Sequence, residues 1–180
     1  MVDKSLIPQP IAKGAFAEIH AATFKCQDVV YKIYKQDGSF ESRLVLDDSV
    51  KREITVLSLI ASRVKEHVNL LSLIGISLNQ EYQFVILKRY PQNLRTFIFN
   101  DGVNNFDDCR RILVGLCAAV NCLHSMGVLH CDIKLENILL QFKGHRVIPV
   151  LTDFGSSKLL PGNSIDLMHV HYAIPHAYAA

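Results

Sequence analysis

Residues 130–137, which read HCDIKLEN, constrain the fold more than any other part of the chain. They place an acid, a base and an amide in one short loop, at Asp132, Lys134 and Asn137. An apolar run follows at residues 138–140, and a second acid arrives as Asp153 in the sequence LTDFG. We expect the fold to bring these polar side chains together at one place.

This layout is typical of a phosphoryl-transfer site. An acid near a nucleophilic hydroxyl group can orient that group and accept its proton, and a cation can neutralise the phosphate that is being moved. An amide oxygen and a second carboxylate can hold magnesium. The alternative interpretation is a polar turn between two strands, with a second turn later in the chain.

The two segments resemble the catalytic loop and the magnesium-binding motif of the protein kinase family. Cys131 is the one departure in the loop, since most kinases have arginine there. The resemblance implies that Asp132 is the catalytic base and that Lys134 steadies the γ-phosphate of ATP. It also implies that Asn137 and Asp153 hold Mg²⁺. Lys134, two residues after the acid, is similar to the serine/threonine class rather than the tyrosine class.

The family resemblance also implies an α+β fold with two lobes, a protein-kinase-like bilobal arrangement. The N-lobe would be a small antiparallel sheet with one helix, and the C-lobe would be helical but incomplete. We expect an N-terminal arm at residues 1–10, the N-lobe at 11–87, a hinge at 88–91 and a partial C-lobe at 92–180. That last part would end in the activation segment.

Composition excludes several other classes of protein. The 180 residues suffice for one domain or two small lobes with a core. Apolar residues make up 49% of the chain, which argues against general disorder. A net charge of +2 gives no indication of nucleic acid or a membrane surface as the main partner.

Cysteine usage and hydropathy predict an intracellular protein of the cytoplasm or nucleus. A viral protein inside a host cell would also fit this prediction. The five cysteines are an odd number without metal-type pairing, which favours a reducing compartment. We expect Cys109, Cys117 and Cys122 to be small buried hydrophobic residues of one helix. Neither a secretion signal nor an apolar run long enough to span a membrane is expected.

Residues 11–19 are predicted to form a strand, a tight turn and a second strand, with Gly14 in the turn. In the kinase family this position is the glycine-rich loop over the ATP phosphates. Ala12 and Ala17 stand where the family has two further glycines, so flexibility is reduced although both side chains are small. An ordinary hairpin is the alternative.

A strand at residues 29–34 is predicted from its β-branched and aromatic residues. Val30 and Lys32 alternate onto one face, which suits an adenine ring beside its phosphates. A lysine that merely reaches water is the alternative. A helix is predicted at residues 50–64, with Glu53 beside its apolar stripe. The family resemblance implies that Glu53 pairs with Lys32, which would grip the α- and β-phosphates.

The remaining nucleotide contacts follow from the family order. A strand pair should begin at residues 67–76 and continue at 82–87, with a turn around Asn79 and Gln80. Leu87 would be the gatekeeper side chain before the hinge, and Leu139 would lie under the adenine. The full set of expected nucleotide-binding residues is Ile11, Gly14, Ile19, Val30, Lys32, Glu53, Leu87, Leu139 and Asp153.

Helices are expected at residues 94–99 and 109–126. Asp107 or Asp108 would cap the second of these helices, and Gly127 would stop it. Four side chains are expected to stack as an internal spine that aligns the lobes: His130, Phe154, Leu57 and Leu73. Ser156, Ser157 and Ser164 are candidates for phosphorylation by composition only.

Three functions compete. The first is a serine/threonine protein kinase that uses ATP and Mg²⁺ on a protein substrate. The second is a decoy that occupies a partner kinase or its substrate without catalysis. It is favoured by the two missing glycines and by the resemblance to a truncated kinase, since residues 173–176 look like a remnant of the family's Ala-Pro-Glu. The third, a small-molecule phosphotransferase, ranks last because such enzymes lack a lysine at position 134. Oligomeric state stays open.

Overall fold

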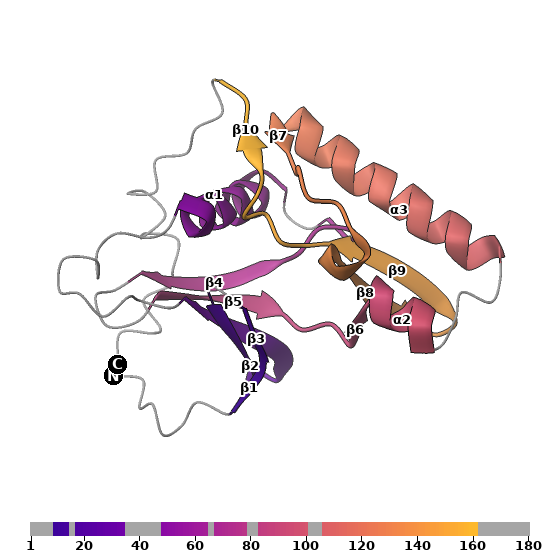
Figure 1. Cartoon of the computed structure of the whole chain (residues 1–180), viewed down its shortest axis with the longest axis horizontal. Coiled ribbons are helices and arrows are strands. Elements are labelled where there is room, and N and C mark those ends of the chain that lie inside the picture. The colour runs from indigo at the N-terminus through magenta and orange to yellow at the C-terminus, as the bar shows by residue number, and fades with distance from the viewer. Residues whose placement is uncertain are drawn as a thin grey trace.

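The structure is a computed structural model, and it describes residues 9–14, 17–34, 48–64, 67–78, 83–100 and 106–161. Figure 1 shows a five-stranded sheet with helix α1 on one side of the molecule, and α2, α3, β8 and β9 on the other. Both helices and antiparallel sheets contribute, so the α+β class expected from the sequence is confirmed.

The five-stranded sheet forms most of the first half of the chain. Its strands are β1 (Pro10–Lys13), β2 (Ala17–Phe24), β3 (Gln27–Tyr34), β4 (Leu73–Leu78) and β5 (Gln83–Lys88). Their order in the sheet is β1-β2-β3-β5-β4, and every neighbouring pair is antiparallel. The backbone N–H of Gly14 donates to the carbonyl of Ala17 at 2.9 Å, between β1 and β2. The two predicted strands are therefore present, and Gly14 lies between them.

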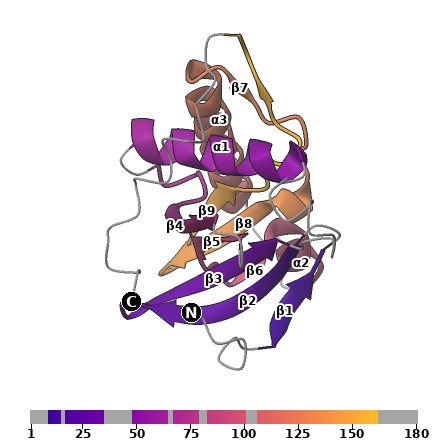
Figure 2. The ribbon, with the colours of Figure 1, turned by 90° about the vertical axis from the view of Figure 1, so that its left-hand side faces the viewer.

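Helix α1 (Asp48–Arg63) lies across one side of this sheet (Figure 2). Its apolar residues recur at helical spacing, so Val50, Ile54 and Leu57 are all buried. The helix predicted at residues 50–64 is thus confirmed, with a start two residues earlier. It carries Glu53 on its buried side.

The strand expected to begin at residue 67 is shorter than predicted, because β4 begins only at Leu73. Leu70 instead forms a parallel bridge to Leu151. The N–H of Leu71 donates to the carbonyl of Leu151 at 3.1 Å, and the N–H of Leu151 donates to that of Asn69 at 2.9 Å. These backbone groups pair with a distant segment, so they are not available to β5. The turn expected around Asn79 and Gln80 lies outside the described residues.

The second half contains two helices and short strands. The helices are α2 (Leu94–Asn100) and α3 (Phe106–Ser125), with a 3₁₀ turn η3 (Leu135–Asn137). The strands are β6 (Gln92–Asn93), β7 (Val128–Leu129), β8 (Ile138–Lys143), β9 (Arg146–Leu151) and β10 (Lys158–Leu159). They form a three-stranded sheet, β6-β8-β9, and a two-stranded sheet, β10-β7.

Helix α3 begins three residues before its predicted start. Asp107 and Asp108 therefore lie in its first turn rather than ahead of it, where their charges favour the positive end of the helix dipole. Gly127 follows the helix with φ +71°, as expected for a stop.

Helix α3 approaches β9 so closely that one position requires glycine. A Cβ on Gly115 would lie 2.5 Å from Cγ of Pro149 and 2.7 Å from Nδ2 of Asn69. That amide of Asn69 in turn donates to the carbonyl of Pro149 at 2.8 Å. The contact holds α3, β9 and the segment before β4 together.

The expected burial of the α3 cysteines is wrong. Cys109 and Cys117 are exposed and Cys122 is only half-buried, and all five cysteines are free thiols. The face of α3 that meets β9 carries Ile112, Gly115, Ala119 and Leu123, so residues 109 and 117 point away from it.

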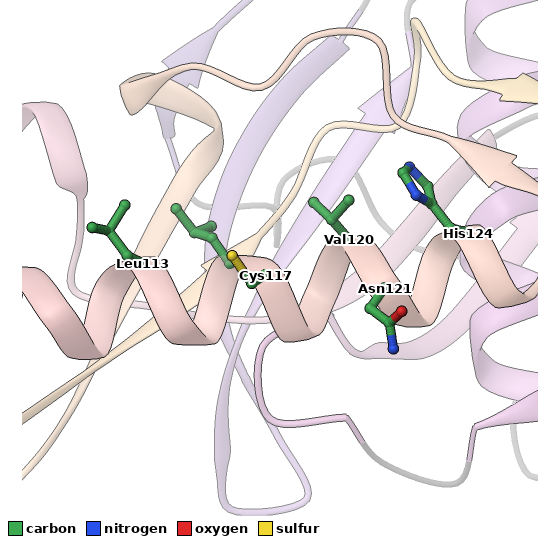
Figure 3. Close-up of a pocket in the computed structure, with 6 residues that line it drawn as sticks. Leu113, Cys117, Val120, Asn121 and His124 are labelled. Atoms are coloured by element: carbon green, nitrogen blue, oxygen red, sulfur yellow. The ribbon is translucent and has the colours of Figure 1, made fainter.

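The outer side of α3 carries a shallow groove of about 340 Å³. Figure 3 shows its labelled side chains along this single helix. The groove is lined by Leu113, Leu116, Cys117, Val120, Asn121 and His124, of which all but Leu116 are labelled in the figure. Among the described residues, no helix is long and apolar enough to cross a membrane.

One hydrophobic core joins the two halves of the chain. Leu57 and Val85 from the first half belong to the same buried cluster as Leu123, Leu140 and Phe154 from the second. Because this core is continuous, the loop at residues 130–137 and the underside of the sheet are held in a fixed relation.

Candidate active site

The predicted nucleotide face lies on the five-stranded sheet. Ile19 stands directly opposite Lys32, and Val30 directly opposite Leu87. Residues directly opposite on neighbouring strands share a face, and Val30 and Lys32 share one by alternation. These four side chains therefore lie on one face of the sheet. Ile11 falls where the β1–β2 register shifts, and it is 56% exposed.

Lys32 and Glu53 form an ion pair on this face. The Nζ of Lys32 lies 2.5 Å and 2.6 Å from the two carboxylate oxygens of Glu53. The Glu53 side chain is 5% exposed and that of Lys32 is 19% exposed. The pair predicted from the sequence is thus present, and it joins β3 to α1.

Tyr34 completes this cluster. Its hydroxyl donates to Oε2 of Glu53 at 3.2 Å, and the Nζ of Lys32 lies 5.8 Å from the centre of its ring. Burial raises the pKa of Tyr34 far above its ordinary value, and the charges of Glu53 and Asp153 raise it further. The hydroxyl therefore remains a neutral donor at any physiological pH.

The loop at residues 130–137 is organised around the Asp132 carboxylate. Its Oδ2 accepts hydrogen bonds from Nζ of Lys134 at 2.7 Å and from Nδ2 of Asn137 at 2.9 Å. Asn137 also donates to the main-chain carbonyl of Asp132 at 2.9 Å. The hydrogen bond from Lys134 is the main reason that the pKa of Asp132 lies below its ordinary value. Asp132 is therefore ionised at neutral pH and able to accept a proton.

His130 connects this loop to the segment that carries Asp153. Its Nε2 lies 2.9 Å from the carbonyl of Thr152, and its Nδ1 lies 3.3 Å from the N–H of Asp132. A carbonyl needs a donor and an N–H needs an acceptor, so the proton sits on Nε2. Burial lowers the pKa of His130, which favours this neutral form. Its ring also meets the ring of Phe154 edge-on, with centres 5.4 Å apart.

Asp153 lies within electrostatic reach of both clusters. Its negative charge contributes to the raised pKa values of Tyr34 and Lys134, and it partly offsets the lowering of the pKa of His130 by burial. The backbone of Asp153 is left-handed, with φ +64°, and Cys131 has the same value. Such conformations are strained for residues other than glycine and gather at functional sites. The site thus brings together Asp153, the buried Lys32–Glu53 ion pair and the polar loop at residues 130–137.

Comparison with known proteins identifies this arrangement. A model of the protein kinase domain matches residues 7–180. The chain belongs to the protein kinase family. It is 32% identical to CBL-interacting serine/threonine-protein kinase 16 of Arabidopsis thaliana, over its whole length and 39% of that protein. It is also 32% identical to the PAS domain-containing serine/threonine-protein kinase of Mus musculus, over 84% of the chain and 11% of that protein.

Both of these relatives are named serine/threonine-protein kinases, the class expected from Lys134. CBL-interacting protein kinase 31 of Oryza sativa subsp. japonica is 29% identical over 99% of the chain and 38% of that protein. The chain thus spans well under half of the length of these relatives. Protein kinases generally use ATP and Mg²⁺.

The donor atoms of this kinase chain suit magnesium. The amide nitrogen of Asn137 is engaged by Asp132, which leaves its oxygen for a metal, and Asp153 offers a carboxylate. Mg²⁺ prefers such oxygen ligands and completes its shell with water and phosphate. Within the described ranges, no group of three or more His, Cys, Asp or Glu side chains could hold a metal by itself. A site completed by a nucleotide fits this donor set.

Sequence reasoning missed two residues of this neighbourhood. Arg52 is exposed, and its Nε donates to the carbonyl of Gly155 at 2.9 Å. Its position beside Glu53 was the available signal. Tyr34 was not singled out, although alternation along β3 places it on the same face as Lys32.

The serines after Asp153 differ in accessibility. Ser157 is buried, and its hydroxyl donates to the carbonyl of His130 at 3.4 Å. This hydroxyl is therefore part of the loop's support and is not accessible for modification in this conformation. Ser156 is exposed, and Ser164 lies outside the described residues.

Proposed function

We propose that this chain binds ATP with Mg²⁺ and transfers the γ-phosphoryl group to a serine or threonine hydroxyl of a protein. The observation that supports this proposal best is the shared neighbourhood of the Lys32–Glu53 pair, the Asp132–Lys134–Asn137 loop and Asp153. These groups come from four separate stretches of the sequence. Their types are those that phosphoryl transfer requires.

The nucleotide would bind between the sheet and β8. Lys32, held by Glu53, would contact the α- and β-phosphates beneath the turn at Gly14. The adenine would lie against Ile19, Val30 and Leu139, with Leu87 behind it, and Ile11 would cover its outer edge. We assign residues 11–87 to the N-lobe, 88–91 to the hinge and 92–180 to a partial C-lobe, following an arm at 1–10.

The transfer step would use the loop. Asp132 would accept a hydrogen bond from the substrate hydroxyl and take its proton as the new O–P bond forms. The bond from the γ-phosphorus to the oxygen of the β-phosphate breaks at the same time, and ADP leaves. Lys134 would neutralise part of the charge on the moving group. Magnesium, held by Asn137 and Asp153, would supply charge stabilisation between the β- and γ-phosphates.

Transfer of radiolabelled γ-phosphate to a mixture of protein substrates tests the proposal. The full chain should label protein, and Asp153→Asn should abolish the labelling. Asp107→Asn is the matched control, because Asp107 is an exposed acid of α3. The melting temperature should also rise with MgATP in the wild type and not in Asp153→Asn. Equal labelling by wild type and Asp153→Asn would overturn the assignment of the site.

A second function, a decoy without catalysis, is favoured by one feature of the sheet. Ala12 and Ala17 replace two glycines of the phosphate-binding turn, and Ala17 is buried. Under this alternative, the chain would bind a partner kinase or its substrate. That binding would be indifferent to Lys32→Met and to Asp132→Asn, whereas phosphate transfer would be absent from the wild type.

An intracellular location, in the cytoplasm or nucleus, remains a prediction. The proposed partners are a protein substrate or a partner kinase, with neither nucleic acid nor membrane. Oligomeric state is not assigned.

A further inference from the structure

The buried cluster around Glu53 contains one polar group that the proposed reaction does not use. Tyr34 is 4% exposed and stands opposite Ala17, the residue that follows the glycine turn. Lys32 and Tyr34 are two residues apart on β3, so both side chains point toward α1. The tyrosine hydroxyl and the lysine ammonium therefore reach the same carboxylate.

The hydrogen bonds divide the Glu53 carboxylate between two partners. Among the described residues, Oε1 bonds only to Nζ of Lys32, whereas Oε2 bonds to Nζ and also to the hydroxyl of Tyr34. A buried carboxylate needs hydrogen-bond donors, because each unpaired polar atom away from water costs free energy. The hydroxyl of Tyr34 is such a donor, and it restrains the rotation of the carboxylate.

We infer that Tyr34 is a positioning residue, which acts through Glu53 to set the direction in which Lys32 presents its ammonium group to the nucleotide phosphates. This inference rests on the proposed function of the site. The ammonium has three N–H donors. Two of them face the Glu53 oxygens, so the orientation of the carboxylate determines where the third one points.

The ring of Tyr34 adds a second contact with the same pair. Nζ of Lys32 lies 5.8 Å from the ring centre, within the range of a cation–π attraction. Removal of the hydroxyl alone leaves this contact in place. The two contributions can therefore be separated by Tyr34→Phe, which keeps the ring, and Tyr34→Leu, which removes both.

The test compares two ligands on the full chain, MgATP and adenosine, by calorimetry. Lys32 would contact the phosphates only, so Tyr34→Phe should weaken MgATP binding by roughly threefold to tenfold, the effect of one ordinary intramolecular hydrogen bond. Adenosine binding should not change. Tyr34→Leu should weaken MgATP binding further. Tyr31→Phe is the matched control from the same strand, and it should bind both ligands as the wild type does.

A double-mutant cycle then shows whether the effect passes through the carboxylate. In the Glu53→Gln background, Tyr34→Phe should cause little additional loss of MgATP affinity, because the neutral amide no longer holds Lys32 by charge. Equal loss of MgATP and adenosine affinity, or fully additive losses in the cycle, would contradict the role of Tyr34. If the wild type binds no MgATP, the proposed function fails instead, and the two failures are therefore distinguishable.

Discussion

The site contains two lysine–carboxylate pairs with opposite environments. Lys32 and Glu53 lie 21 residues apart in the sequence, on different elements, and are largely buried. Lys134 and Asp132 lie two residues apart in one loop, and their side chains are 48% and 32% exposed. Identical chemical groups are thus used in two ways. The buried pair is built into the core, whereas the exposed pair is open to solvent.

The two pairs should contribute differently to the stability of the fold. A buried charge that loses its partner destabilises the protein, because water cannot replace the partner. An exposed charge in a loop is screened by solvent, so its ion pair contributes little to stability. Substitutions at the two pairs should therefore change different measurements.

The largest expected effect concerns the exposed pair. On the proposed function, Asp132→Asn removes the proton acceptor and should lower phosphate transfer by about 10²-fold to 10⁴-fold. The melting temperature should stay close to that of the wild type. Steady-state labelling and thermal unfolding on the same preparation measure both quantities. A large fall in melting temperature would show that the loop pair stabilises the fold, and it would contradict the contrast between the two pairs.

The next effect concerns the buried pair. Lys32→Met should lower the free energy of unfolding by about 3–5 kcal/mol, because it leaves the buried Glu53 carboxylate without its cation. Glu53→Gln should lower it less, since the lysine is the more exposed partner and can reach water. Denaturant unfolding measures both losses, and Lys143→Met, at an exposed position on β8, is the control. Equal losses from both changes would contradict the asymmetry.

The smallest effect concerns pH and the histidine between the two clusters. The native pKa of His130 is below its ordinary value of 6.5, so the unfolded chain binds the proton more readily. Stability from this group is present above pH 6.5 and is lost as the pH falls through that value toward the native pKa. The ordinary pKa values of Asp132 and Glu136 already lie well below this pH range, and their native values are lower still. Neither carboxylate therefore titrates in this range.

Unfolding measured between about pH 7.5 and pH 5.5 tests this sign. The wild type should lose stability over this range, and His130→Gln should lose less, although it is less stable throughout. Some dependence will remain, because burial also lowers the pKa of His67. His124→Gln, at an exposed position of α3, should behave as the wild type does. An unchanged slope in His130→Gln would contradict the assignment.

Much of the site could be predicted because its signals are local. The spacing within residues 130–137 and the segment around Asp153 depend on short stretches of sequence. Strand alternation and helix periodicity placed Lys32 and Glu53 in their elements, and the resemblance to kinases supplied their pairing. The helices of the second half were also predictable within a few residues, because their apolar residues recur with the helical period.

The unpredicted features all depend on partners far away in the sequence. Arg52 bonds to Gly155, which lies 103 residues later. Leu70 pairs with Leu151 rather than extending β4, and no local sequence pattern predicts that pairing. The burial of the α3 cysteines depends on which side of the helix meets β9, and an apolar pattern on both sides of the helix left that side undetermined.

The bridge at Leu151 means that Asp153, two residues later, is not positioned by the β8–β9 hairpin alone. Asn69 and Leu71, ahead of β4, hold the end of β9 by two backbone hydrogen bonds. A shortened polypeptide that starts after residue 72 would retain β8 and β9 but would lose these two hydrogen bonds. The segment that carries Asp153 therefore depends on residues from the first half of the chain, and the two halves are not independent folding units.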